Sequence, residues 1–100
     1  RPDMPPVTEL RRTKDGSLVV EVDRADAGPW LAAGYKMPQV FKAKARDGKT
    51  DIWGVVYRPA NFDPTKKYPV IEDIYAGPQS SFVPKTWSAS NGMHSLAQLG

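Results

Sequence analysis

Residues 67–78 read KYPVIEDIYAGP, an apolar run that leads into a Gly-Pro turn. The run predicts a strand from Pro69 to Tyr75, because proline is tolerated at a strand's first position and β-branched residues follow it. Tyr75 then lies where a buried strand breaks into a turn, which is where α/β enzymes position catalytic groups. The stretch therefore predicts an α/β class of fold and makes Tyr75 the first candidate site residue.

The segment before this stretch predicts an antiparallel pair of strands. Basic and small apolar residues alternate from Val40 to Arg46, which is typical of a strand. Asp47-Gly48 predicts a turn, after which 50–58 returns as the partner strand. Both faces of 50–58 are apolar, so we expect neighbours to cover each face and Trp53 to lie in the core.

The two ends of the chain carry further local signals. Val7–Arg12 and Leu18–Asp23 flank the sequence KDGS, which predicts a second hairpin. Residues 25–33 predict one short helical turn that starts at Pro29 and ends at Gly34. Met93, Leu96, Ala97 and Gly100 follow Asn91 at helical spacing, so a short capped helix is expected there.

Two motifs together resemble a known family. The sequence DGKTDIWGVVYRPANFD at 47–63, followed by KYPVIEDIYAGP at 67–78, resembles the start of the catalytic domain of the prolyl oligopeptidase family of serine peptidases. The resemblance is nearest to the dipeptidyl peptidase IV-like branch, and its specificity lies in the order and spacing of several elements. It covers residues 40–87 well and 5–39 loosely.

The resemblance implies a domain division and a fold class. Residues 1–39 would be the end of a β-propeller and the connecting segment, and 40–100 the N-terminal part of an α/β-hydrolase domain. The expected fold is thus a β-dominated α/β fragment, with antiparallel hairpins plus the first strands and first helix of an α/β-hydrolase. Since a later strand separates the second and third strands of that fold, the fragment is expected to have unpaired edges. The expected consequence is weak stability, a homodimer through those edges, or a rearranged sheet.

The resemblance also implies a function. In this branch the tyrosine of the Tyr-Ala-Gly-Pro element supplies an oxyanion-hole hydroxyl, a role that the resemblance carries onto Tyr75. The family's Ser, Asp and His lie far beyond this tyrosine, so the 100 residues are expected to be inactive alone. The whole protein is expected to hydrolyse short peptides, releasing N-terminal dipeptides, without a cofactor. Position alone favours packing as the role of Tyr75; the resemblance favours catalysis.

Other residues with reactive side chains are weaker candidates. Glu72 and Asp73 would point to opposite faces of a strand, so they cannot act on one substrate, and a partner Lys or Arg is the better interpretation. Ser90 lies in SASNG, which lacks the first glycine and the preceding strand of a nucleophile elbow. His94, the one histidine, is expected on the last helix at the surface or half-buried.

Composition excludes several classes of function. The chain has 100 residues, no cysteine and one histidine, so neither disulfides nor a metal site is expected. The net charge of +3 is spread along the chain, and no apolar stretch is long enough to span a bilayer. Residues 1–6 are too polar for a signal peptide. No compartment is assigned, since a periplasmic or secreted location requires a leader in a longer precursor.

An alternative function is a small β-rich binding or interaction module. Basic residues near Trp53 and Tyr57 have the composition of a surface for single-stranded nucleic acid. We favour a solvated strand face with these two aromatic residues in the core, so nucleic acid is not an expected partner. The basic residues concerned are Lys42, Lys44, Arg46, Lys49 and Arg58.

Overall fold

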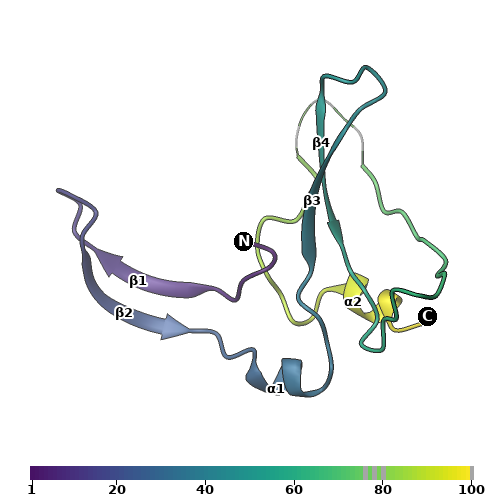
Figure 1. The fold of residues 1–100 in the computed structure, drawn as a ribbon. Helices are drawn as coiled ribbons and strands as arrows, with labels where there is room; N and C mark the ends of the chain where they lie inside the picture. The colour runs from purple at the N-terminus through teal and green to yellow at the C-terminus, as the bar shows by residue number, and fades with distance from the viewer. Residues whose placement is uncertain (76, 78, 80, 100) are drawn as a thin grey trace.

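The described residues form a β-dominated fold with two separate antiparallel hairpins and two short helices (Figure 1). The computed structural model describes residues 1–75, 77, 79 and 81–99. In chain order the elements are β1 (Val7–Arg11), β2 (Leu18–Arg24), α1 (Gly28–Ala32), β3 (Gln39–Lys44), β4 (Asp51–Val56) and α2 (Gly92–Ala97). The predicted β-dominated class and the two hairpins are confirmed, whereas the α/β-hydrolase assignment stays a prediction.

The first hairpin forms where the Asp-Gly signal predicts it. Strands β1 and β2 pair antiparallel, and the Arg12 amide donates to the Ser17 carbonyl at 2.9 Å to close the loop. The Asp15 carboxylate accepts from the Ser17 amide at 3.0 Å, and Gly16 has a φ of 72°, which side chains with a Cβ rarely adopt. The hairpin extends away from the part of the molecule that contains β3, β4 and α2 (Figure 1).

The second hairpin is also confirmed. Its register runs without a bulge from Gln39 opposite Val56 to Lys44 opposite Asp51. The Asp47 side chain accepts from the amides of Lys49 at 2.8 Å and Thr50 at 2.9 Å, and Gly48 has a φ of 67°. These local bonds hold the turn in place without support from neighbouring elements.

Trp53 does not lie in a core, so this expectation is wrong. Its side chain is 55% exposed, and the ammonium of Lys42 lies 5.5 Å from the centre of its ring. A two-stranded ribbon has two open faces, and no third strand joins β3 and β4 within the described residues. The apolar pattern of this strand predicted neighbours that the described part of the chain does not supply.

Both helices lie close to their predicted positions. Helix α1 has a proline in its first turn, and Gly34, with a φ of 92°, donates to the Leu31 carbonyl at 2.9 Å beyond its end. The side chain of Asn91 accepts from the Met93 amide at 2.9 Å and caps α2. Gly100, the last residue predicted for this helix, lies outside the described residues.

The strand predicted from Pro69 to Tyr75 is not formed, which corrects the sequence interpretation. A strand needs a neighbour for its amides and carbonyls, and none of the described strands pairs with this segment. Its apolar side chains are open to solvent, and Val70 is 91% exposed. Ala76 and Pro78, which complete the predicted Gly-Pro turn, lie outside the described residues.

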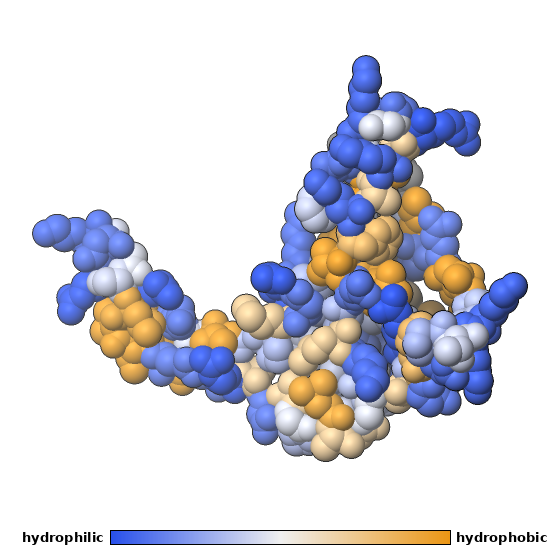
Figure 2. All heavy atoms as spheres, viewed as in Figure 1, coloured by the Kyte–Doolittle hydropathy of each residue, from blue (hydrophilic) through white to orange (hydrophobic). Residues whose placement is uncertain are grey.

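The chain exposes more surface than a compact protein of its size. Its accessible area is 8076 Å², against about 5,600 Å² from the scaling of monomeric proteins. Its radius of gyration is 17.0 Å, against about 13 Å for a compact 100-residue domain. Figure 2 shows apolar side chains at the surface of the β1–β2 hairpin. Folding of these residues thus leaves a large apolar area without a partner.

Candidate functional site

Tyr75, the predicted oxyanion-hole residue, lies in the extended segment that follows Pro69. It is 62% exposed, and its ring centre lies 6.0 Å from that of Phe82 at an interplanar angle of 44°. The contact with Phe82 links Tyr75 to a residue seven positions later in the chain. A phenol can donate a hydrogen bond to a developing negative charge, and this one is accessible to a ligand from solvent.

The weaker catalytic candidates are Glu72, Asp73 and Ser90, and in the described residues they do not form a site with Tyr75. Glu72 and Asp73 are exposed, and since they are not in a strand, the alternation argument is not tested. The Ser90 hydroxyl lies 3.3 Å from that of Ser88 on an exposed turn. No strand precedes Ser90 among the described residues of this loop, so its environment differs from a nucleophile elbow.

His94 is buried, so the expectation of a surface or half-buried imidazole is wrong. It is 4% exposed, and three aromatic residues from distant parts of the chain contact it. Its ring centre lies 4.8 Å from Tyr57, 4.9 Å from Trp30 and 6.4 Å from Tyr35, each nearly perpendicular to it. We name the aromatic cluster by its members, which are Trp30, Tyr35, Tyr57, Trp87 and His94.

The remaining contacts within the aromatic cluster are between its own rings. Trp30 stacks on Tyr35 with a centroid distance of 5.1 Å, and its edge-to-face contact with Trp87 has a centroid distance of 5.7 Å. Such pairs contribute about 0.5–1.5 kcal/mol each beyond the area that they bury. The cluster is therefore the main core of the described chain. In the same part of the chain, the other buried residues are Ala27 and the prolines Pro2, Pro38 and Pro59.

Burial changes the protonation of groups in the aromatic cluster. It lowers the pKa of His94 and raises the pKa of Tyr57, because a charged form would lose its hydration in both cases. Within the described residues, the Nε2 atom of His94 is buried without a hydrogen-bond partner. Asn91 donates from Nδ2 to the Tyr57 hydroxyl at 3.1 Å, which joins the cap of α2 to the cluster.

The sequence predicts little of this cluster beyond the position of His94 on a helix. Aromatic residues are spaced irregularly over positions 30 to 87, and no periodic pattern groups them. The Asn91 cap placed His94 on a helix, but its burial follows from the meeting of α2 with α1, the segment after α1 and the end of β4. Such long-range contacts are not encoded in any local pattern.

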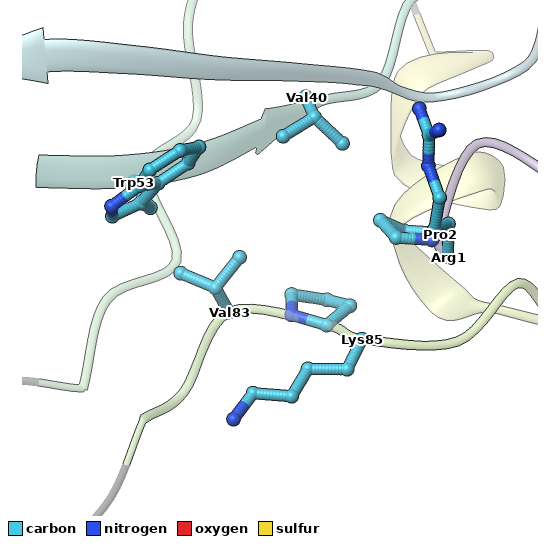
Figure 3. Close-up of a pocket in the computed structure, with 7 residues that line it drawn as sticks. Arg1, Pro2, Val40, Trp53, Val83 and Lys85 are labelled. Carbon is cyan, nitrogen blue, oxygen red and sulfur yellow. The ribbon is translucent and has the colours of Figure 1, made fainter.

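A surface cavity of about 420 Å³ lies between the second hairpin and the segment at 83–85 (Figure 3). Its walls are apolar, with Val40 and Trp53 on one side and Val83 and Pro84 on the other, and Arg1 and Lys85 lie at its margin. Tyr75 does not line it. The cavity therefore has no direct connection with the candidate oxyanion-hole residue.

Residues 1–75, 77, 79 and 81–99 contain no group of three or more His, Cys, Asp or Glu side chains arranged to hold a metal ion. In the same part of the chain, neither short helix has the length and apolar character that a bilayer crossing requires.

Comparison with known proteins shows the relationship of the chain. It is 34% identical over 76 residues to dipeptidyl peptidase 8 of Homo sapiens, which is 74% of this chain and 8% of that protein. It is 36% identical over 88 residues to dipeptidyl peptidase 4 of Trichophyton rubrum, which is 84% of this chain and 11% of that protein. No protein-family model and no solved structure gives a significant match.

These relatives are dipeptidyl peptidases, so the chain is related to a class of peptidases. The matches confirm the resemblance to the dipeptidyl peptidase IV-like branch of the prolyl oligopeptidase family. The chain spans about a tenth of the length of the relatives that it matches.

Proposed function

We propose that this chain is the segment of a serine-type dipeptidyl peptidase in which the catalytic domain begins. The observation that carries the proposal is the match to dipeptidyl peptidases over about three quarters of the chain. In the whole protein, residues 1–39 would end a β-propeller and 40–100 would start an α/β-hydrolase domain. The substrates would be short peptides that lose an N-terminal dipeptide.

Within this enzyme, we assign Tyr75 to the oxyanion hole. Attack on a peptide carbonyl builds negative charge on its oxygen, and a pre-placed donor stabilises the transition state by about 3 kcal/mol. The exposed phenol of Tyr75 can donate such a bond to a ligand from solvent, and its ring centre lies 6.0 Å from that of Phe82. A backbone N–H of the whole enzyme would supply the second donor.

The remaining catalytic groups would come from other parts of the whole protein. Acyl transfer by this mechanism needs a serine nucleophile, a histidine that accepts its proton and an aspartate that orients the histidine. Ser90 and His94 do not meet these requirements here, because Ser90 is on an exposed turn and His94 is enclosed by aromatic rings. Residues 1–100 alone are therefore expected to have no peptidase activity.

The test is Tyr75→Phe in the full-length enzyme, measured with a chromogenic dipeptide substrate that has Pro or Ala in its second position. Tyr68→Phe is a matched control. It also removes one phenol hydroxyl, but that hydroxyl accepts from the Asp63 amide at 2.9 Å and holds the loop before the segment. We expect Tyr75→Phe to lower kcat by roughly 10² to 10³ and Tyr68→Phe to leave kcat nearly unchanged.

Two outcomes would contradict the assignment of Tyr75. An unchanged kcat and KM in Tyr75→Phe would remove this residue from the mechanism, and an equal loss in both variants would show that the hydroxyl acts through loop structure. Absence of dipeptide release by the wild-type enzyme would refute the proposed activity itself.

We further propose that the isolated chain associates with itself through its open strand edges, as an interaction module would. It exposes 8076 Å², roughly 2,500 Å² more than a compact chain of this mass. That excess is in the range of large, stable interfaces. Light scattering after size-exclusion chromatography tests this, and a monomer with a cooperative melt at high temperature would contradict it.

A further inference from the structure

We propose that the aromatic cluster is a pH-sensitive latch, in which neutral His94 holds helix α2 against α1 and the end of β4, and protonated His94 releases it. The inference concerns a group that the proposed peptidase mechanism does not use. It rests on the position of the imidazole among the rings of Trp30, Tyr35 and Tyr57 and does not depend on the role of Tyr75.

The geometry makes His94 the link between three parts of the chain. His94 lies on α2, Trp30 lies on α1, and Tyr57 directly follows β4. The imidazole contacts both rings edge-to-face, with centroid distances of 4.9 Å and 4.8 Å. The imidazole is the buried side chain of α2, so its packing is the main apolar contact that attaches this six-residue helix, beside the hydrogen bonds of Asn91 with Tyr57 and of Gln98 with the Ala60 amide. A helix this short is not stable without such contacts.

The surroundings favour the neutral imidazole. From the segment after α1 the facing titratable group is the phenol of Tyr35, and from the end of β4 it is the phenol of Tyr57. Burial raises the pKa of Tyr57, which keeps its phenol neutral between pH 5 and 7.5. Helix α1 contributes the uncharged ring of Trp30, against which Trp87 packs from the 81–91 segment. Helix α2 itself adds the amide of Gln98, whose Nε2 donates to the His94 carbonyl at 3.2 Å.

No neighbouring charge offsets the loss of hydration when His94 is protonated. Within the described residues, the imidazole forms no ion pair and its Nε2 atom has no acceptor. Burial alone lowers the pKa of His94 in the closed cluster. The open state, with a water-exposed imidazole, takes up its proton near the ordinary value of about 6.5.

The direction of the pH effect follows from proton uptake. The contribution of the latch to the stability of the closed state is fully present above about pH 6.5, because His94 is then neutral in both the closed and the open state. As the pH falls below this value, the open state binds a proton first, and the opening constant rises by up to about tenfold per pH unit. The rise ends once the pH falls below the lowered pKa of closed His94.

Hydrogen exchange of the α2 amides between pH 7.5 and 5, corrected for intrinsic rates, tests the proposal on the chain as it stands. His94→Phe is the diagnostic variant, because phenylalanine retains the aromatic packing and cannot be protonated. Tyr35→Phe is the control, because it keeps His94 and removes a facing phenol. We expect the opening constant of α2 to rise on acidification in wild type and in Tyr35→Phe, and to stay constant in His94→Phe.

An equal acid response in His94→Phe would overturn the proposal, as would a wild-type helix whose opening does not change with pH. If His94→Phe fails to fold, titration of the wild-type imidazole by NMR tests the proposal instead. A midpoint clearly below 6.5, with loss of the Trp30 and Tyr57 contacts below it, supports the latch. A midpoint at or above 6.5 overturns it.

Discussion

Removal of the Asn91 side chain should destabilise the chain more than any other single change at its helix ends. Asn91 has two roles in the structure. Its Oδ1 accepts from the Met93 amide at 2.9 Å and caps α2, and its Nδ2 donates to the part-buried Tyr57 hydroxyl at 3.1 Å. One residue thus connects the start of the helix to the aromatic cluster.

The magnitude of the Asn91→Ala effect follows from these two bonds. Loss of an N-cap costs about 1 kcal/mol, and loss of a hydrogen bond to a part-buried hydroxyl costs about 0.5–1.5 kcal/mol. The sum is about 2 kcal/mol, which for a domain of this size corresponds to roughly 8–16 °C in Tm. In a chain with so small a core, this is a large fraction of the free energy of unfolding.

Two further variants separate the roles of Asn91. Asn91→Ser retains a good capping oxygen but is too short to reach Tyr57, so about half of the loss is expected. Tyr57→Phe removes only the hydroxyl and should cost about 1 kcal/mol. Urea unfolding followed by tryptophan fluorescence measures each change, because Trp30 and Trp87 lie in the same cluster. The reasoning is refuted if Asn91→Ala is no more destabilising than Tyr57→Phe.

Two other predictions concern the turns. Gly34→Ala should cost about 1–2 kcal/mol, because Gly34 has a φ of 92° and an added Cβ would lie 3.4 Å from that of Ala60; an unchanged Tm would contradict this. Hydrogen bonds from the Thr50 hydroxyl and from the amides of Lys49 and Thr50 lower the pKa of Asp47. The contribution of these hydrogen bonds to stability is therefore present above about pH 4 and is lost as the pH falls through the lowered pKa of Asp47. Exchange of these two amides should accelerate on acidification, and Asp47→Ala should abolish the pH dependence.

The elements that the sequence predicted are those with local causes. Both hairpins follow from Asp-Gly turns, whose glycines have φ values of 72° and 67°. Helix α2 follows from the Asn91 cap, and the end of α1 follows from Gly34. Each of these depends on a residue and its near neighbours along the chain, so a pattern in the sequence is sufficient to find it.

The expectations that failed depend on partners at a distance. The apolar segment from Pro69 to Tyr75 has the composition of a buried strand, yet a strand requires a ladder, and the described strands offer none to it. Trp53 is exposed for the same reason. The burial of His94 requires three segments to meet, and no local pattern encodes that meeting.

The position of Tyr75 shows what its proposed role demands of the rest of a peptidase. A donor stabilises an oxyanion strongly only when it is held in place and shielded from water, because water competes for the same hydrogen bond and screens the charge. Tyr75 is 62% exposed and lies in a segment without strand pairing. Elements of the whole peptidase that covered Val70, Ile71 and Ile74 would therefore have two effects. They would bury the apolar surface of these residues in a sheet, and they would fix Tyr75 at the sheet's edge in a drier environment. Catalytic competence and completion of the sheet would then be the same structural event.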